Sequence, residues 1–206
     1  MGMSDQKILP RYKDYIRQLI KLGVIKNKNV KIAWLGQQDP EQSPSGNIVM
    51  YDNLSSLFFD SCVHEFFDIE NTPVWDVNND WAIKDYDIVI SFRLNYLIPS
   101  VTHMLKETKK VVDNNGVYIT DFCSGNVNSS IMTTISWNEE SSNLIAFLPE
   151  YWQLGDLDGS KFKPVAEEDN LLTKQKIDDQ NLAIHNFASF RCPKQRHYII
   201  CTMEKK

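Results

Sequence analysis

The sequence predicts an α/β fold in which helices cover both faces of a mostly parallel β-sheet. Three observations lead to this prediction. Residues 85–122 read as a strand, a helix and a strand, a βαβ unit whose crossover is nearly always right-handed. Residues 30–36 form another apolar run of strand length. Residues 182–190 and 197–202 are typical of the two strands of an antiparallel hairpin, joined by a connection that contains Pro193.

The βαβ unit is the clearest pattern in the chain. Residues 86–91 are a continuous apolar run, as in a strand that is buried on both faces of a parallel sheet. Ser100 is the expected N-cap of the following helix, in which apolar residues recur at spacings of three and four. The Asn-Asn-Gly sequence at 114–116 tolerates the left-handed conformation of a C-terminal cap, so we expect the helix to end there. Residues 117–122 are the next strand.

The other expected elements complete one domain, with residues 1–29 as an N-terminal helical extension and residues 30–206 as the α/β core. An amphipathic helix at residues 10–22 either packs at the sheet edge or covers a ligand as a lid. Further elements are a short helix at 53–62, a strand at 63–68 and a helix at 139–152. Residues 71–84 are too few for an ordinary crossover helix, so we expect one such helix to be missing there.

Composition and charge narrow the functional classes. A chain of 206 residues with 42% hydrophobic and 24% charged residues suits one ordinary globular domain. A formal net charge of −5 argues against a non-specific binder of nucleic acid or of anionic membranes, because such binders need clustered Lys and Arg. No apolar run approaches the roughly 20 residues of a membrane span, and the N-terminus lacks the apolar segment of a signal peptide. The four cysteines show no CxxC spacing and read as reduced thiols, so we expect a cytoplasmic protein.

Two phrases of the βαβ unit carry a family resemblance. The sequences YDIVIS at 86–91 and VVDNNG at 111–116, with Leu94 and Leu97 between them, resemble the second half of class I S-adenosylmethionine (SAM)-dependent methyltransferases. The resemblance covers residues 30–202 and implies a seven-stranded, mostly parallel Rossmann-like sheet. It also implies an antiparallel C-terminal strand and SAM as the cofactor.

The cofactor loop departs from the family pattern. In that family the first strand ends in an acidic residue and a glycine-rich loop, whose backbone approaches SAM. Gly36 stands in the place of the first glycine, whereas Trp34 takes the acidic place and Gln38 the place of the second glycine. The loop at 37–46 is longer and more polar than usual, so it either wraps the cofactor differently or has lost the site.

The resemblance also assigns the other cofactor contacts. An acidic residue at the end of the second strand would bind the ribose hydroxyls, and Asp68 is in that place, with Glu70 as the alternative. Against the adenine, either Asp76 or Asp80 would lie, with Trp75 or Trp81 stacked on the ring. The cofactor residues implied are Gly36, Gln37, Asp68, Asp76, Trp81, Ser91 and Phe92.

Candidate acceptor and catalytic residues follow the strands of the βαβ unit. Open α/β sheets bind ligands beyond the carboxyl ends of their strands. The substrate residues expected there are Arg93, Asn95, Tyr96, Ser124 and Asn126. His103, in the first turn of the helix, is the candidate general base, since histidine titrates near neutral pH; a surface histidine is the competing interpretation. Asp121 is the second catalytic candidate.

The leading hypothesis is a SAM-dependent methyltransferase that methylates a hydroxyl group of a small molecule or a sugar. The departures at Trp34 and Gln38 motivate an alternative, a methyltransferase-like module that binds a partner without catalysis. A third hypothesis, a nucleotide-sugar enzyme related to glycosyltransferases, rests on residues 32–49. We assign no metal-binding residue and expect no nucleic-acid or membrane partner, and the metal requirement and oligomeric state stay open.

Overall fold

A computed structural model gives the fold, which it describes for residues 3–43, 46, 48–77, 79–94, 100–123, 174–191 and 197–206. The expected helix at residues 139–152 lies outside the described residues. The helices are α1 (Met3–Leu22), α2 (Val49–Leu54), the 3-10 helix η1 (Ser55–Leu57), α3 (Val101–Asp113) and α5 (Lys174–Asp179). The strands are β1 (Lys31–Leu35), β2 (Val63–Phe67), β3 (Ile88–Ser91), β4 (Val117–Cys123), β5 (Leu182–Arg191) and β6 (His197–Lys205).

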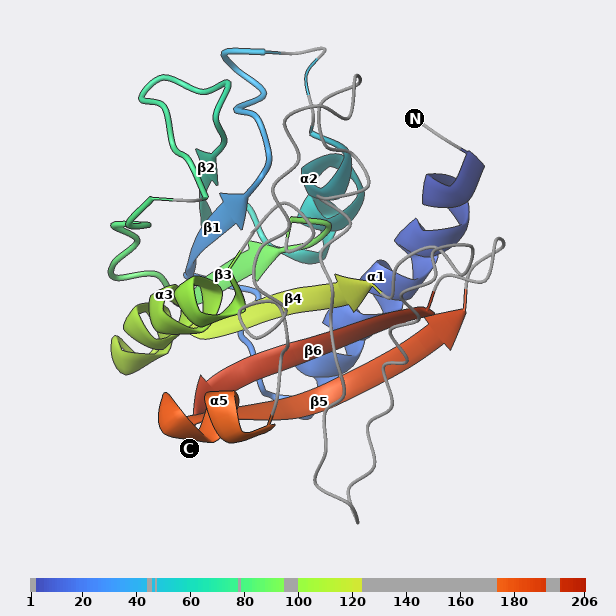
Figure 1. Cartoon of the computed structure of the whole chain (residues 1–206). Coiled ribbons are helices and arrows are strands. Elements are labelled where there is room, and N and C mark those ends of the chain that lie inside the picture. The colour runs from blue at the N-terminus through green and yellow to red at the C-terminus, as the bar shows by residue number, and fades with distance from the viewer. Residues whose placement is uncertain are drawn as a thin grey trace, which may run out of the picture.

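The described strands form one sheet in the order β2-β1-β3-β4-β6-β5 (Figure 1). Strands β2, β1, β3 and β4 are parallel, whereas β6 is antiparallel to both β4 and β5. The predictions of a mostly parallel sheet and of an antiparallel C-terminal strand are therefore confirmed. The sequence predicts seven strands, and the described residues form six.

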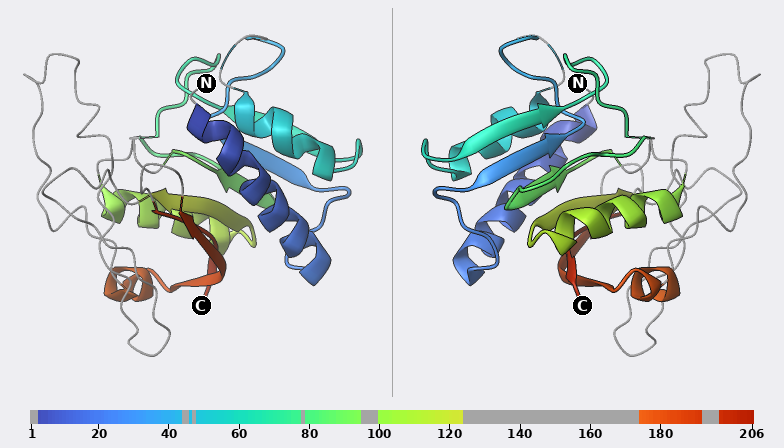
Figure 2. Two further views of the ribbon diagram at one scale, coloured as in Figure 1. Left: turned by 90° about the vertical axis from the view of Figure 1, so that its right-hand side faces the viewer. Right: turned by 90° about the vertical axis from the view of Figure 1, so that its left-hand side faces the viewer.

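The direction of the crossovers decides which helix covers which face. From β1 the chain passes through α2 to β2 on one side, and from β3 it passes through α3 to β4 on the other side. Right-handed crossovers in opposite directions place their helices on opposite faces of a sheet. Accordingly, α1 and α2 pack on one face, and α3 and α5 pack on the other (Figure 2).

The connection from β2 to β3 differs from an ordinary crossover. Its described residues, 68–77 and 79–87, contain neither a helix nor a strand. This agrees with the prediction that a crossover helix is missing there. Within the described residues, β2 consequently stays at the edge of the sheet, where it pairs only with β1.

Alternation along the central strands builds two apolar cores. Ala33 and Val89 point to the α3 side, where they pack with Trp81 and Met104. On the α1 side, the core holds side chains from β1, β3, β4, β6, α1 and α2. Its fully buried members include Tyr12, Ile16, Ile32, Trp34, Leu54, Ile119 and Ile200.

The ends of the helices follow the chemistry of their residues. The side chain of Ser100 accepts the N–H of His103 at 3.1 Å, which confirms Ser100 as the N-cap of α3. Asn115, just after α3, has a φ of 63°, the left-handed conformation expected at this end. The first helix begins at Met3, earlier than residue 10, and the helix expected at 53–62 is instead the pair α2 and η1. None of the described helices combines the length and apolarity that a bilayer crossing requires.

Candidate functional site

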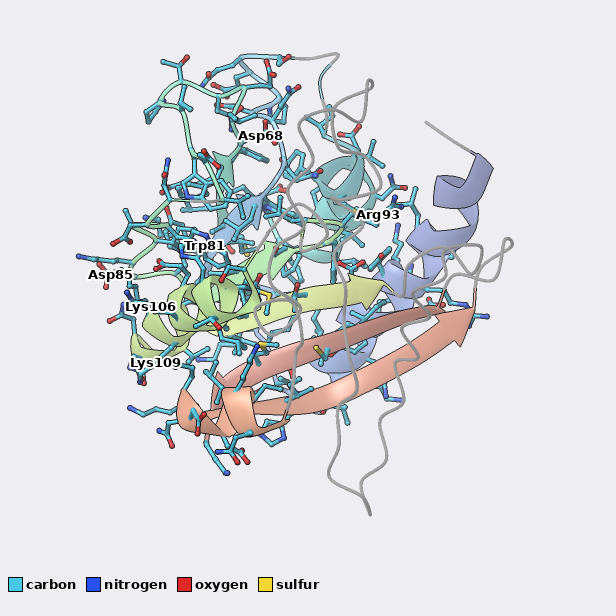
Figure 3. All side chains as sticks on the ribbon, viewed as in Figure 1. Asp68, Trp81, Asp85, Arg93, Lys106 and Lys109 are labelled. Carbon is cyan, nitrogen blue, oxygen red and sulfur yellow. The ribbon has the colours of Figure 1, made fainter. Side chains whose placement is uncertain are left out.

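The topology of the sheet locates the candidate site. The chain leaves β1 in one direction and β3 in the other, so the strand order reverses between these two neighbours. Open α/β sheets bind ligands at such a switch point, outside the carboxyl ends of the strands. The loops that begin at Gly36 and at Phe92 therefore enclose the candidate site, and Asp68 directly follows the adjacent strand β2. Figure 3 places Asp68 and Arg93 at the carboxyl ends of these strands.

The two loops at the switch point touch at Gly36. Gly36 has a φ of +70°, a conformation that favours glycine, and its N–H donates to the Phe67 carbonyl at 2.7 Å. A Cβ atom on Gly36 would lie 2.9 Å from Cδ1 of Leu94, which is itself buried. The first glycine of the family pattern is thus required here by its backbone conformation and by the close approach of Leu94.

Gln37 is a buried polar residue that holds the β1–α2 loop. Its Nε2 donates to the Gly36 carbonyl at 2.7 Å. Its Oε1 accepts the N–H groups of Met50 at 2.9 Å and of Tyr51 at 3.4 Å, in the first turn of α2. Only 3% of Gln37 is exposed, so its side chain satisfies the α2 amides and does not face an open site.

The polar loop after Gln37 is fastened to the loop after β2. The buried side chain of Asn71 accepts the N–H of Asp39 at 2.9 Å and donates to the Gln37 carbonyl at 3.3 Å. The Gln42 side chain accepts the N–H of Thr72 at 2.9 Å and donates to its carbonyl at 3.1 Å. The additional residues of this loop therefore hold it against the loop after β2, at the carboxyl end of the sheet.

Asp68 lies where the ribose of a nucleotide cofactor is expected. It directly follows β2 and is half-buried. Its Oδ1 accepts the N–H of Glu70 at 3.0 Å, and its carbonyl accepts the N–H of Trp75 at 3.1 Å. The loop after β2 is thereby folded around Asp68, whereas Glu70, the alternative, is exposed.

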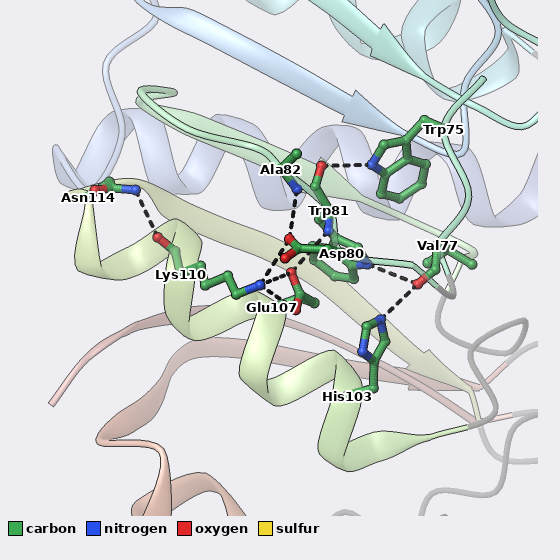
Figure 4. A network of polar contacts seen from close by, with 9 residues as sticks. All are labelled: Trp75, Val77, Asp80, Trp81, Ala82, His103, Glu107, Lys110 and Asn114. Carbon is green, nitrogen blue, oxygen red and sulfur yellow. Dashed lines mark hydrogen bonds and ion pairs between the residues drawn. The ribbon is translucent and has the colours of Figure 1, made fainter. Parts of the chain in front are cut away.

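The tryptophan candidates differ in their surroundings (Figure 4). Trp81 is 1% exposed; its backbone N–H donates to Glu107 at 3.0 Å and its indole to the Val77 carbonyl at 2.9 Å. Glu107 is also buried and pairs with Lys110 at 2.8 Å. Trp81 is thereby a core residue with both donors satisfied. Trp75 is half-buried and lines an open cavity, so it has the more accessible ring.

The acidic candidates near the adenine position also differ. Asp80 is exposed, pairs with Lys110 at 2.9 Å and accepts the N–H of Ala82 at 3.2 Å. The hydrogen bond from Lys110 is the main cause that lowers the pKa of Asp80. Asp76 is half-buried, and its carbonyl accepts the N–H of Asn79 at 3.0 Å. Asp80 therefore anchors α3 to the preceding loop, and Asp76 stays the candidate.

Ser91 and Phe92, at the end of β3, face opposite sides of the sheet. Phe92 packs on the α1 side, with its ring centroid 4.5 Å from that of Tyr12. Ser91 is fully buried, and its carbonyl accepts the Thr120 hydroxyl at 2.9 Å. Burial raises the pKa of Tyr118, and a hydrogen bond with Ser91 opposes that effect, so these two buried hydroxyls lie beside each other in the core.

Asp121 joins three elements on the α1 side of the sheet. Its Oδ2 accepts the Tyr12 hydroxyl at 2.6 Å, and its Oδ1 accepts the N–H of Arg93 at 2.7 Å. Burial raises the pKa of the Asp121 carboxyl, and the hydrogen bond from Tyr12 opposes that effect. Arg93 has a φ of 60°, which is uncommon for a residue with a side chain, and the bond to Asp121 fixes it there.

His103 lies in the first turn of α3 and faces the loop before β3 (Figure 4). Its Nε2 is 3.2 Å from the Val77 carbonyl. A carbonyl only accepts hydrogen bonds, so Nε2 carries a proton in this contact and Nδ1 of the neutral ring keeps a lone pair. The half-buried ring is therefore oriented by the protein, as a base must be, and is not an unattached surface histidine.

The structure brings only some of the predicted residues together. Gly36 and the segment Ser91–Arg93 meet at the switch point, with Asp68 on the neighbouring strand. His103 and Asp121 do not share a cleft, because α3 packs on one face of the sheet and the Asp121 carboxylate contacts Tyr12 on the other. The predicted substrate residues Asn95, Tyr96, Ser124 and Asn126 lie outside the described residues.

Sequence reasoning missed two residues that shape the site. Leu94 covers Gly36, and Tyr12 holds Asp121 from a helix more than 100 residues away in the sequence. Tyr12 was expected on the apolar face of the first helix and Leu94 in the loop after the central strand, and no local pattern reveals which carboxylate or glycine they contact. Among the described residues, no group of three or more His, Cys, Asp or Glu side chains could hold a metal ion.

Comparisons with known proteins address the fold. No family model and no curated protein sequence matches the chain. Among solved structures, magnesium protoporphyrin IX methyltransferase from Synechocystis PCC 6803, with bound SAH, matches with a TM-score of 0.52 and 9% identity. That match covers 100% of this chain and 89% of the other.

Two further structures are similar at lower scores. The trans-methyltransferase CalH, complexed with SAH, has a TM-score of 0.47 and 14% identity over 99% of this chain, which spans only 60% of CalH. A SAM-dependent methyltransferase from Aquifex aeolicus has a TM-score of 0.45 and 9% identity over 95% of this chain and 97% of its own.

Proposed function

We propose that this protein, which has the Rossmann-like fold of class I SAM-dependent methyltransferases, is itself a SAM-dependent methyltransferase. The observation that carries the proposal is that a glycine and a carboxylate occur together at the switch point. A glycine with a φ of +70° directly follows β1, and the carboxylate of Asp68 follows the neighbouring β2. In this fold, a nucleotide cofactor approaches the backbone at the glycine turn after the first strand, and its ribose binds the acidic residue after the second.

The described residues fit SAM at the ribose and at the glycine turn. Asp68, directly after β2, would accept hydrogen bonds from the ribose hydroxyls, and Gly36 would allow close approach of the backbone. When bound, SAM supplies an electrophilic methyl group to an acceptor oxygen. The remaining task of the protein is then to hold and align that acceptor.

We further propose a hydroxyl of a small molecule or a glycan as the acceptor, with His103 as its base. The contact of Nε2 with the Val77 carbonyl leaves Nδ1 to take the hydroxyl proton. Asp121, engaged on both oxygens, is proposed as a positioning residue, because it fixes the backbone of Arg93 in the loop beside the site.

A second candidate function is a methyltransferase-like module that binds a partner without catalysis. The specific observations in its favour are Gln37, which occupies the α2 amides, and Leu94, which packs over Gly36. Both side chains belong to the protein and occupy space near the cofactor loop that a bound cofactor would otherwise use.

Isothermal titration calorimetry with SAM and with SAH tests the proposal. We expect the wild-type protein to bind both ligands and Asp68→Asn to bind SAM more weakly by about 1–3 kcal/mol, because a charged hydrogen-bond acceptor is lost. Glu70→Gln, at an exposed carboxylate in the same loop, is the matched control and should leave the affinity unchanged. A folded wild-type protein that binds neither ligand would reject the methyltransferase and support the binding module.

A further inference from the structure

The outer edge of β2 presents hydrogen-bonding groups to its surroundings. The N–H of Val63 donates to the Val30 carbonyl at 2.9 Å, and the Phe67 carbonyl accepts from Gly36 at 2.7 Å, so both residues face β1. Successive residues of a strand direct their backbone groups to opposite edges. The N–H and C=O groups of His64 and Phe66 therefore point away from β1, where the described residues provide no further strand.

Exposed apolar side chains precede and follow β2 in the sequence. Among the described residues, five large apolar side chains are exposed, and four of them belong to residues 59–74: Phe59 at 57%, Val63 at 53%, Ile69 at 61% and Val74 at 69%. Phe59 and Val63 lie before and at the start of β2, and Ile69 and Val74 lie in the loop after it, so both ends of the open strand carry exposed apolar side chains.

The strand also lacks three of the features that protect an edge. Lysine, proline and a bulge each hinder pairing with another chain, and β2 has none of them. The sequence of β2 is VHEFF, with a regular register against β1. Its one charged residue, Glu65, is engaged within the chain by the Tyr86 hydroxyl and by Lys31, whose Nζ lies 2.9 Å from Oε1.

A groove runs along the same edge. A cavity of about 810 Å³ is lined by four consecutive residues of β2, 64–67, together with the loops at 39–42 and 71–75. Because neighbouring side chains point to opposite faces, this groove has two walls. One wall is formed by Tyr51, His64 and Phe66, and the other by Phe67 and Trp75.

The charge of the groove selects its occupant. The described residues that line it include the carboxylates of Asp39 and Glu41 and no Lys or Arg, whereas Glu65, also in the lining, is already paired with Lys31. A basic segment is complementary to such a lining. A second copy of this chain would instead bring two sets of carboxylates together across the edge, which is unfavourable.

We propose that the β2 edge binds an extended peptide segment of a partner protein, in which apolar residues alternate with Lys or Arg. The segment adds as a further strand beside β2. Backbone hydrogen bonds to His64 and Phe66 supply the pairing, and the two walls of the groove receive alternate side chains. The five residues of β2 span about 16 Å at ~3.3 Å per residue, so a short segment suffices. The groove shares Trp75 with the expected adenine position, but the inference does not depend on methyl transfer.

Fluorescence anisotropy with a labelled peptide tests the charge requirement. The probe is a peptide of about eight alternating Val and Lys residues, and its counterpart has Glu in place of Lys. We expect the Lys peptide to bind at least about tenfold more tightly than the Glu peptide. Glu41→Lys, at an exposed lining residue, should weaken binding, whereas Asp14→Lys, the same charge change on α1, should not. Equal binding of the two peptides would overturn the proposal.

Backbone methylation of the same peptide tests strand addition. One derivative is N-methylated at every Val and another at every Lys, so that each blocks one edge of the added strand. We expect one derivative to lose binding and the other to keep it. If both bind as well as the unmodified peptide, the backbone of β2 is not used and the proposal fails.

Amide hydrogen exchange and sedimentation identify other occupants of the edge. The N–H groups of His64 and Phe66 should exchange quickly in the free protein and slowly with the Lys peptide. Slow exchange in the free monomer would show that the chain covers this edge itself, which contradicts the proposal. A dimer by sedimentation that is dispersed by Val63→Lys would assign the edge to a second copy and also contradict it.

Discussion

Asp121 is a carboxylate in a buried position whose ionisation opposes folding. Burial raises the pKa of the folded-state carboxyl above its value of about 3.9 in an unfolded chain. The folded state therefore holds the proton more tightly. The contribution of this group to stability is fully present below the unfolded pKa and is lost as the pH rises through the folded pKa.

Asp121→Asn tests that linkage, because asparagine is neutral and keeps an acceptor for the N–H of Arg93. Relative to the wild type, the variant should become more stable as the pH rises from about 4 to about 7, as urea unfolding at both pH values would show. Tyr12→Phe, which removes one partner of the carboxylate, should cost about 1–3 kcal/mol. An Asp121→Asn effect of equal size at both pH values would contradict the raised pKa.

His103 combines an oriented ring with one remaining nitrogen lone pair. His103→Gln keeps a donor for the Val77 carbonyl but supplies no base, whereas His103→Ala removes both. If the ring is a general base, both variants should lose about 10²–10⁴-fold in rate at saturating SAM. Near-normal turnover by His103→Gln, together with a slow His103→Ala, would assign His103 a positioning role only.

At the scale of elements, the short helix α2 depends on a side chain from outside it. Gln37 accepts the N–H groups of Met50 and Tyr51, which have no partner within the helix. Gln37→Ala should therefore lower the free energy of unfolding by about 1–3 kcal/mol, because buried donors are left unsatisfied. Gln42→Ala, at an exposed residue of the same loop, should cost less. A SAM affinity that falls in Gln37→Ala without any loss of stability would make Gln37 a cofactor contact instead.

Local patterns were sufficient to predict the strands and α3. The apolar run at 86–91, the Ser100 cap and the Asn-Asn-Gly stop each act over a few residues, so they can be read from the sequence. The limits of α1 and α2 were less accessible. Met3–Pro10 is polar at its start, and the N-terminus of α2 is stabilised by Gln37, thirteen residues before Met50, which no capping pattern reveals.

The candidate site was predictable in part for the same reason. Gly36 and Asp68 follow strands directly, so strand prediction alone puts them at the carboxyl edge of the sheet. The roles of Trp81 and Gln37 could not be predicted, because partners far away in the sequence fix the position of an indole or an amide side chain. Trp81 is held by Val77 and Glu107, and its burial makes it a core residue where a stacking role was expected.

At the scale of the whole molecule, one sheet separates two apolar cores. The α1 side contains Trp34 and Ile16, and the α3 side contains Trp81 and Leu105. Helix α1 belongs to residues 1–29, which the sequence presents as an extension, yet its side chains fill the α1-side core. Because the same strands carry both cores, we predict that the two sides unfold together as one unit.

Ile16→Ala tests this prediction, since Ile16 is fully buried on α1. Removal of its side chain should cost about 2–5 kcal/mol. Fluorine NMR of 5-fluorotryptophan at Trp34 and Trp81 would follow the two cores separately during urea unfolding. In the variant, both resonances should report the same urea midpoint, lower than that of the wild type. Arg17→Ala, at the neighbouring exposed position, should change stability by no more than about 0.5 kcal/mol. A midpoint that falls at Trp34 alone would show that α1 and its core unfold independently, and residues 1–29 would then be an extension in energetic terms too.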